Sequence, residues 1–253
     1  MINWHRLFGL ALADYFTDTA YQVEMEKDLA RKRQLLDIVI LRAVGNGPPL
    51  PELCDGLEDL RVHNLLTYKS GQEALDAWAL EELIGHYVNY RKSVAPREPA
   101  RAFGLYAVAT RRPEALLREV ELQAVKAGVY TVRALHQPIT VIVLKDVARA
   151  TRNALWALFS FDADRVAQGA QDYVWRQPDH ASVLPELYHR YQHVGIAMAY
   201  TFEDFQRDLA RRLVLELPPE ERLRGLPPEE RLRGLSEEEL RRLQQLLENK
   251  LKH

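Results

Sequence analysis

The sequence predicts an α/β protein with a charged helical extension at its C-terminus. Three observations support this fold class: strand-like and helix-like segments alternate through residues 1–215, hydrophobic residues make up 47% of the chain and charged residues 28%, and a nine-residue repeat begins at residue 218. These proportions are those of an ordinary globular domain. We therefore expect one α/β domain over residues 1–215, helical in its last part, and a charged helical repeat tail over residues 216–253.

The first predicted elements are one helix and three strands. Residues 4–17 are expected to form a helix, because their apolar side chains recur at three- and four-residue spacing. Residues 21–26 alternate between apolar and polar side chains, which is the two-residue period of a strand. Residues 35–41, LLDIVIL, are a short and branched apolar run that favours a strand buried on both faces. After a loop rich in Gly and Pro, residues 63–70, HNLLTYKS, predict a third strand.

A long helix and a further strand complete the predicted core. Residues 73–91 have a broad apolar face at helical spacing, and residues 103–109, FGLYAVA, read as a strand. The order is therefore helix, three strands, helix, strand. The elements expected beyond this core are a short helix from Pro113, strands near 129–132 and 139–144, and three helices between 153 and 215.

The tail contains the nine residues PPEERLRGL twice, at 218–226 and 227–235. Pro and Glu at the start of each copy, and Arg and Gly at its end, are start and stop signals of a helix of one to two turns. Residues 236–252 predict a longer amphipathic helix with a seam of leucines at 240, 243 and 247. Two interpretations stay open: a solvated appendage, or an arm for self-association or docking through this narrow seam.

Charge and cysteine content restrict the partners and the compartment. The 34 Lys and Arg residues against 36 Asp and Glu residues give a net charge of −2, so the overall charge gives no argument for a nucleic-acid or anionic-membrane partner. The single cysteine, Cys54, cannot form an internal disulfide, as is usual in a reducing cytosol. Because no apolar stretch approaches the roughly 20 residues of a membrane helix, we expect a soluble cytoplasmic protein without a membrane partner.

The chain lacks the motifs of several common sites. GxxxxGK[ST], GxGxxG, HExxH, CxxC and GxSxG are all absent, which removes the usual sequence support for the site types that they mark. His189 and His193 lie one helical turn apart, but no neighbouring carboxylate completes a three-ligand zinc site. Surface histidines are therefore the expectation at these positions.

Two charged residues stand out in the predicted strands. Asp37 lies within LLDIVIL, where its neighbours on the same strand face are Val39 and Leu41, and Lys69 ends the strand HNLLTYKS. A carboxylate in such apolar surroundings is costly unless charges or hydrogen bonds compensate. One interpretation is an ion pair between Asp37 and Lys69 that fixes the strand register. The other is a metal site, in which Asp37 binds Mg²⁺ and Lys69 steadies the attacking water or the developing phosphoryl charge.

The order of elements, an Asp in the second strand and a third strand ending in x-x-Lys together resemble the PD-(D/E)XK nuclease fold. More narrowly, the segments VEMEKDLARKRQLLDIVILR, DGLEDLRVHNLLTYKS and ALDAWALEELIGHYVNYRK, with the PEERLRGL repeats, resemble bacterial Rpn-type recombination-promoting nucleases and the transposase-related proteins of that group. The resemblance spans most of residues 1–110 and the tail. It implies a restriction-endonuclease-like core and Mg²⁺-dependent cleavage of DNA.

The resemblance also assigns roles to individual residues. Asp37 matches the metal-binding Asp of the family and Lys69 its catalytic Lys, whereas Thr67 stands where the family has Asp or Glu. Because a hydroxyl carries no charge, this departure removes one of the two central anions of a Mg²⁺ site. We choose Glu26 as the replacement, since its strand leads directly towards Asp37. The expected catalytic residues are Asp37, Lys69, Thr67 and Glu26, with Asp37 and Glu26 as metal ligands; other candidate carboxylates are Glu24, Glu73, Glu81 and Glu82.

Two functional hypotheses follow from this assignment. The first is a metal-dependent DNA phosphodiesterase. The second is a binding or interaction module that keeps the nuclease fold and has lost catalysis through Thr67. The basic clusters at 27–33, 91–92 and 111–112 could line a DNA-facing rim. On the long helix, polar residues one turn apart are expected near the site or in the core, namely the pairs His86 with Tyr90 and Tyr87 with Arg91.

Overall fold

The computed structural model of the chain divides into two compact units, Met1–Phe202 and Glu203–His253, which are described separately. The second unit contains the whole predicted tail. The residues that the structure describes are 4–25, 38–45, 52–94, 98–134, 137–177, 180, 182–196, 207, 210, 214, 218–222 and 236–251.

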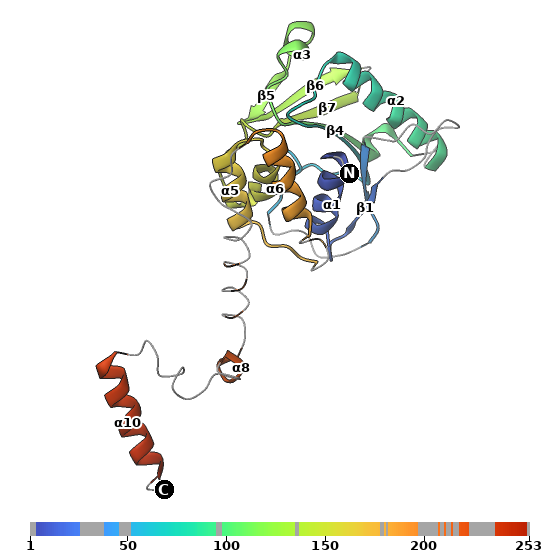
Figure 1. The fold of residues 1–253 in the computed structure, drawn as a ribbon. Helices are drawn as coiled ribbons and strands as arrows, with labels where there is room; N and C mark the ends of the chain where they lie inside the picture. Colours follow the sequence, from blue (N-terminus) through green and yellow to red (C-terminus); the bar gives the residue numbers. More distant parts are fainter. Residues whose placement is uncertain are drawn as a thin grey trace. The chain divides into compact units, whose positions relative to one another are not determined.

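The first unit is built on a seven-stranded mixed sheet with the strand order β1-β2-β3-β4-β7-β6-β5 (Figure 1). The strands are β1 Tyr21–Met25, β2 Ile38–Ala43, β3 His63–Lys69, β4 Phe103–Ala109, β5 Gln123–Lys126, β6 Val129–Ala134 and β7 Gln137–Val143. The three central strands β3, β4 and β7 are parallel to one another, and every other neighbouring pair is antiparallel.

Helices cover both faces of this sheet. In Figure 1, α2 lies on one side of the sheet, and α1, α5 and α6 lie together on the other. The helices of this unit are α1 Trp4–Tyr15, α2 Ala77–Val94, α3 Glu114–Glu119, α4 Ala154–Leu158, α5 Ala163–Asp172 and α6 Val183–His193, with short 3₁₀ helices η1 Ala100–Ala102 and η2 Thr151–Asn153. The α/β class and the order helix, three strands, helix, strand are therefore confirmed.

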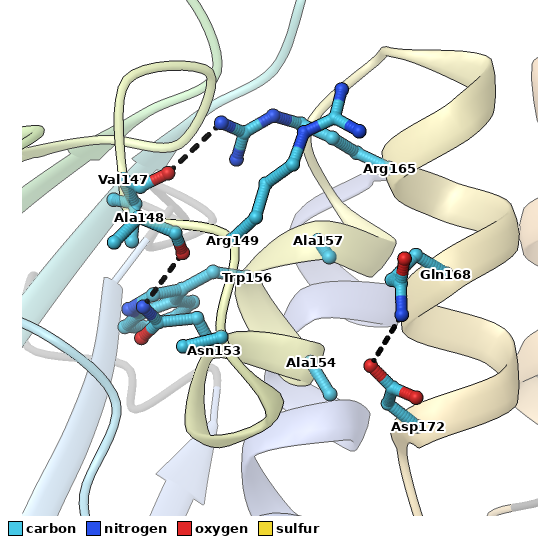
Figure 2. Close-up of a pocket in the computed structure, with 11 residues that line it drawn as sticks. Val147, Ala148, Arg149, Asn153, Ala154, Trp156, Ala157, Arg165, Gln168 and Asp172 are labelled. Carbon is cyan, nitrogen blue, oxygen red and sulfur yellow. Dashed lines mark hydrogen bonds between the residues drawn. The ribbon is translucent and has the colours of Figure 1, made fainter.

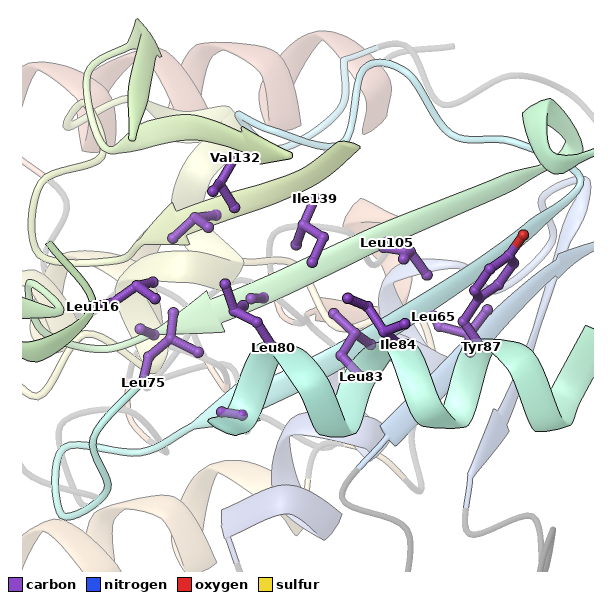
Figure 3. Close-up of a cluster of buried hydrophobic side chains, with 14 of the residues drawn as sticks. Leu65, Leu75, Leu80, Leu83, Ile84, Tyr87, Leu105, Leu116, Val132 and Ile139 are labelled. Atoms are coloured by element: carbon purple, nitrogen blue, oxygen red, sulfur yellow. The ribbon is translucent and has the colours of Figure 1, made fainter. Parts of the chain in front are cut away.

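The two faces of the sheet hold two apolar layers. On one face, Leu80, Leu83 and Tyr87 of α2 pack against Leu105 and Ile139 of the central strands (Figure 3). These positions alternate with those of the other face, because successive side chains of a strand point to opposite sides.

On the other face, Phe8 of α1 is fully buried and stacks on Tyr68 of β3, with ring centroids 4.3 Å apart. Phe159 meets the Phe8 ring edge-on, with centroids 5.2 Å apart. The aromatic side chains thus connect α1, β3 and the chain after α4 into one core.

Two of the differences from the sequence expectation, one helix boundary and one additional strand, have local reasons. Helix α2 begins at Ala77 rather than near residue 73, because the Asp76 carboxylate accepts a hydrogen bond from the Ala79 N–H and so caps the helix. Glu73 instead accepts a hydrogen bond from the Ser70 hydroxyl, at 2.8 Å, within the preceding turn. Strand β5 was not expected, since all four of its residues are exposed and carry no apolar alternation.

The second unit contains α8 Pro219–Arg222, which lies in the first repeat copy, and α10 Glu237–Leu251. Helix α10 is the predicted long amphipathic helix. Its start is fixed by a reciprocal capping box: the Ser236 N–H donates to Glu239 Oε2 at 2.8 Å, and the Glu239 N–H donates to Ser236 Oγ at 3.3 Å. Leu240 and Leu243 of the predicted seam are each 38% exposed.

Candidate functional site

The parallel strands β3, β4 and β7 end side by side at one edge of the sheet. Main-chain hydrogen bonds join their ends: the Thr110 N–H donates to Lys69 O at 3.0 Å, and the Lys145 N–H donates to Thr110 O at 3.2 Å. Ligands of open α/β sheets commonly bind outside the carboxyl ends of parallel strands. We call this region the carboxyl edge, and it is where the predicted Lys69 lies.

Lys69 and Thr67 share the face of β3 that α2 covers. Thr67 pairs with Ile38 of β2 and Ala107 of β4 and is buried, at 4% exposed. Lys69 is partly exposed, and within the described part of the chain its ammonium has neither an ion-pair nor a hydrogen-bond partner. An unpaired cation at a strand end can receive an anionic group of a ligand.

The two predicted carboxylate ligands, Asp37 and Glu26, lie outside the described residues. The described part of β2 nevertheless indicates the face on which Asp37 is expected. Val39 and Leu41 are expected on that same face, and they pair with Leu66 and Asn64 of β3. These partners point away from the face of Thr67 and Lys69. Convergence of Asp37 on Lys69 therefore stays a prediction, and it requires an irregularity such as a β-bulge next to Ile38.

The other candidate carboxylates that the structure describes are engaged elsewhere or exposed. Glu24 forms an ion pair with Arg42 Nε at 3.3 Å, and Glu73 lies 3.8 Å from His5 Nε2 besides accepting from Ser70. Glu81 and Glu82 are exposed on α2. Across the described ranges, no three His, Cys, Asp or Glu side chains cluster so as to hold a metal ion. The described residues alone thus do not form a Mg²⁺ site.

Basic side chains accompany Lys69 along the carboxyl edge. Arg111 and Lys145 are exposed next to the strand ends, and Arg112 Nε lies 3.6 Å from Glu114 Oε1. By contrast, Arg91 of the expected cluster at 91–92 donates to Tyr87 Oη and to Glu98 O, at 3.1 and 2.9 Å. The cluster at 27–33 lies outside the described residues.

Tyr90 of α2 lies at the other end of β3, beside His63. Tyr90 Oη lies 3.0 Å from His63 Nδ1, and His63 Nε2 lies 3.3 Å from Glu98 Oε1. Burial, with a smaller effect of the Glu24 charge, raises the pKa of Tyr90 to about 12. Since His63 begins β3 and Lys69 ends it, about 20 Å of strand separates this cluster from Lys69. These residues therefore stabilise the packing of α2 and do not approach the carboxyl edge.

Sequence reasoning missed a network around Asp55, in the loop between β2 and β3. The Asp55 carboxylate is 2% exposed and accepts hydrogen bonds from Lys126 Nζ at 2.6 Å, Arg152 Nε at 3.0 Å and Asn153 Nδ2 at 2.6 Å. Burial alone would raise the pKa of Asp55, but these three donors outweigh it and lower the pKa to about 2. No local motif marks this residue, because its partners follow it by 71 to 98 positions.

The neighbouring Cys54 is buried and has a free thiol. Its Sγ lies 3.1 Å from Arg152 O, and its N–H donates to Tyr15 Oη at 2.9 Å. Burial raises the pKa of the Cys54 thiol to about 12, which keeps it protonated at neutral pH. An inert, buried thiol is a packing residue.

Comparison of the chain with protein-family models, with curated proteins and with solved structures gave no match. Among the described helices, none combines the length and the apolar character that are needed to cross a membrane. The fold and the carboxyl edge therefore define an α/β protein with a basic strand-end surface, and its function is inferred from these features.

Proposed function

We propose that this chain is a metal-dependent DNA phosphodiesterase of nuclease-like fold, which binds the DNA backbone at the carboxyl edge. The observation that carries the proposal is the position of Lys69. It ends β3, and its ammonium is unpaired within the described residues. Main-chain hydrogen bonds connect Lys69 to Thr110, and Thr110 to Lys145, at the neighbouring strand ends. The order of elements around it supports the same reading. Arg111 and Lys145 extend the positive surface that a phosphodiester requires.

Each residue has a different role in the proposed hydrolysis. The Lys69 ammonium balances the negative charge that develops on the phosphoryl oxygens. Asp37 and Glu26 are the carboxylates proposed to hold Mg²⁺, which when bound supplies Lewis acidity and an activated water. Thr67 offers a neutral hydroxyl in place of a carboxylate, so we expect Mg²⁺ affinity and cleavage to be low.

The test is cleavage of supercoiled plasmid and of labelled duplex DNA with Mg²⁺ or Mn²⁺, and with EDTA. Lys69→Ala and Asp37→Ala should abolish cleavage while the melting temperature stays within about 2 °C of the parent. Arg101→Gln is the matched control, because Arg101 is exposed in η1 at the opposite end of β4. Cleavage that survives Lys69→Ala would contradict the proposal.

A catalytically inactive DNA-binding module is the second candidate, and the strand register favours it. In the described part of β2, the face expected for Asp37 is opposite to that of Lys69, and Thr67 lacks a charge. This candidate predicts DNA binding that Lys69→Ala weakens, with no cleavage in any metal. Fluorescence anisotropy with labelled duplex, run beside the cleavage assay, separates the two functions. Both proposed functions would be excluded if the parent protein does not bind DNA and Lys69→Ala only causes the protein to unfold.

A further inference from the structure

A second basic feature lies on the face of the sheet opposite to α2. A small pocket opens between the loop that follows β7 and the helices α4 and α5, and Figure 2 shows the residues that line it. Its lining includes the small apolar side chains of Ala154 and Ala157. Arg149 and Arg165 reach across its rim from the loop and from α5.

The Arg165 guanidinium is held in place by the main chain. It donates to Leu144 O at 3.3 Å and to Val147 O at 2.9 Å, the latter drawn in Figure 2. A guanidinium has five N–H donors, so Arg165 keeps donors beyond these two bonds. Because the two carbonyls belong to the end of β7 and the loop after it, the orientation of the side chain is fixed by the sheet itself.

The second arginine is placed beside the first without a counter-ion between them. Arg149 is exposed, and neither arginine has an ion pair within the described part of the chain. Both arginines line the same pocket, and like charges repel. Burial lowers the pKa of Arg165, and the positive charge of Arg149 lowers it further. Two adjacent guanidinium groups that repel are stabilised by an oxyanion that both can bind.

None of the described acidic residues near the pocket forms an ion pair with Arg149 or Arg165. Asp162 accepts a hydrogen bond from the Arg165 main-chain N–H at 3.0 Å and so caps α5. Asp172 accepts from Gln168 Nε2 at 2.9 Å, one helical turn along α5. Asp146 is exposed in the turn after β7. Asp162 and Asp146 attract Arg165, but their effect does not offset burial and the charge of Arg149.

We propose that Arg149 and Arg165 form an oxyanion site that binds a phosphate group at the mouth of this pocket. The proposal does not depend on cleavage at Lys69, because neither arginine is among the residues proposed to hold the metal or to balance the phosphoryl charge there. Its ligand is either inorganic phosphate or a phosphate of a nucleic-acid backbone, since both present the same tetrahedral oxygens to the paired guanidinium groups.

The test is the melting temperature of the full chain in inorganic phosphate, against sodium chloride of the same ionic strength. At about ten times the dissociation constant, phosphate should raise the melting temperature by about 3–6 °C. Arg149→Gln should remove this shift and Arg149→Lys should keep part of it. Arg101→Gln, which removes the same charge from the opposite end of β4, should leave the shift unchanged.

A second arm identifies the source of the phosphate. Binding of a short labelled oligonucleotide to the Arg149→Gln and Arg101→Gln variants is measured by fluorescence anisotropy. If only Arg149→Gln binds the oligonucleotide more weakly, the ligand is a backbone phosphate. If both variants bind it equally, but Arg149→Gln has lost the thermal shift, the ligand is inorganic phosphate. An equal phosphate shift in both variants overturns the proposal. So does the absence of any effect of phosphate or oligonucleotide on the parent protein beyond that of chloride.

Discussion

Replacing Asp55 with Asn removes the charge at the centre of the network that joins the β2–β3 loop to β5 and η2. In the folded protein its pKa is about 2, against an ordinary value of 3.8. One pKa unit corresponds to about 1.4 kcal/mol, so ionised Asp55 stabilises the fold by about 2–3 kcal/mol. This estimate applies to a carboxylate that is 2% exposed and is therefore little screened by solvent. We expect Asp55→Asn to lower the free energy of unfolding by that amount at pH 7.

The sign of the pH dependence follows from the direction of the shift. Because the folded pKa lies below the unfolded one, the stabilisation is fully present above about pH 4 and is lost as the pH falls towards 2. Urea unfolding of both proteins at several pH values measures this difference. Asp59→Asn is the control, since Asp59 lies in the same loop but is 77% exposed and pairs with Arg61 only at the surface. A difference that is below about 0.5 kcal/mol, or that persists unchanged to pH 2.5, would refute this account.

Three further predictions concern packing and the tail. Phe8→Ala should cost about 3–5 kcal/mol in urea unfolding, because it empties a fully buried ring site stacked on Tyr68. Gly128→Ala should cost more than about 1 kcal/mol, since the residue has φ +71° and an added Cβ would collide with the main chain of Val147; an unchanged melting curve would contradict this. Removal of residues 217–253 should leave the melting temperature of the remaining protein unchanged. If the leucine seam self-associates, light scattering should show an oligomer for the full chain and a monomer for the truncated one.

Much of the fold could be predicted because its patterns are local. The third strand, 63–70, and the strand 103–109 were found from short apolar runs, and they form β3 and β4 nearly at the expected bounds. The Asp55 network could not be found in this way, because its donors come from parts of the chain that only the sheet brings together. The face on which a strand residue lies also depends on register, which the alternation of β2 alone does not give. The position of Lys69 at a strand end was therefore predictable, whereas its relation to Asp37 was not.

The position of Thr67 allows the catalytic hypothesis to be tested by restoring the missing charge. Thr67 and Lys69 lie two residues apart on one face of β3, so a carboxylate at position 67 would lie about 7 Å from Lys69 along the strand. Because Thr67 is 4% exposed, Thr67→Glu should cost about 1–3 kcal/mol of stability, reduced by the neighbouring ammonium. If Asp37 does converge on this face, Thr67→Glu should raise Mg²⁺-dependent cleavage at least about tenfold, which is about 1.4 kcal/mol in the barrier.

Thr67→Gln is the matched control for this substitution, since it has the same volume without the charge and should lose similar stability with no gain in cleavage. The assay is initial-rate cleavage of labelled duplex, with near-ultraviolet circular dichroism to confirm that each variant is folded. A folded Thr67→Glu variant that still binds DNA but cleaves no faster than Thr67→Gln would show that the carboxyl edge binds DNA without catalysing its hydrolysis. That result is expected if the regular alternation of β2 continues through Asp37, because the Asp37 carboxylate would then lie on the opposite face of the sheet from Lys69.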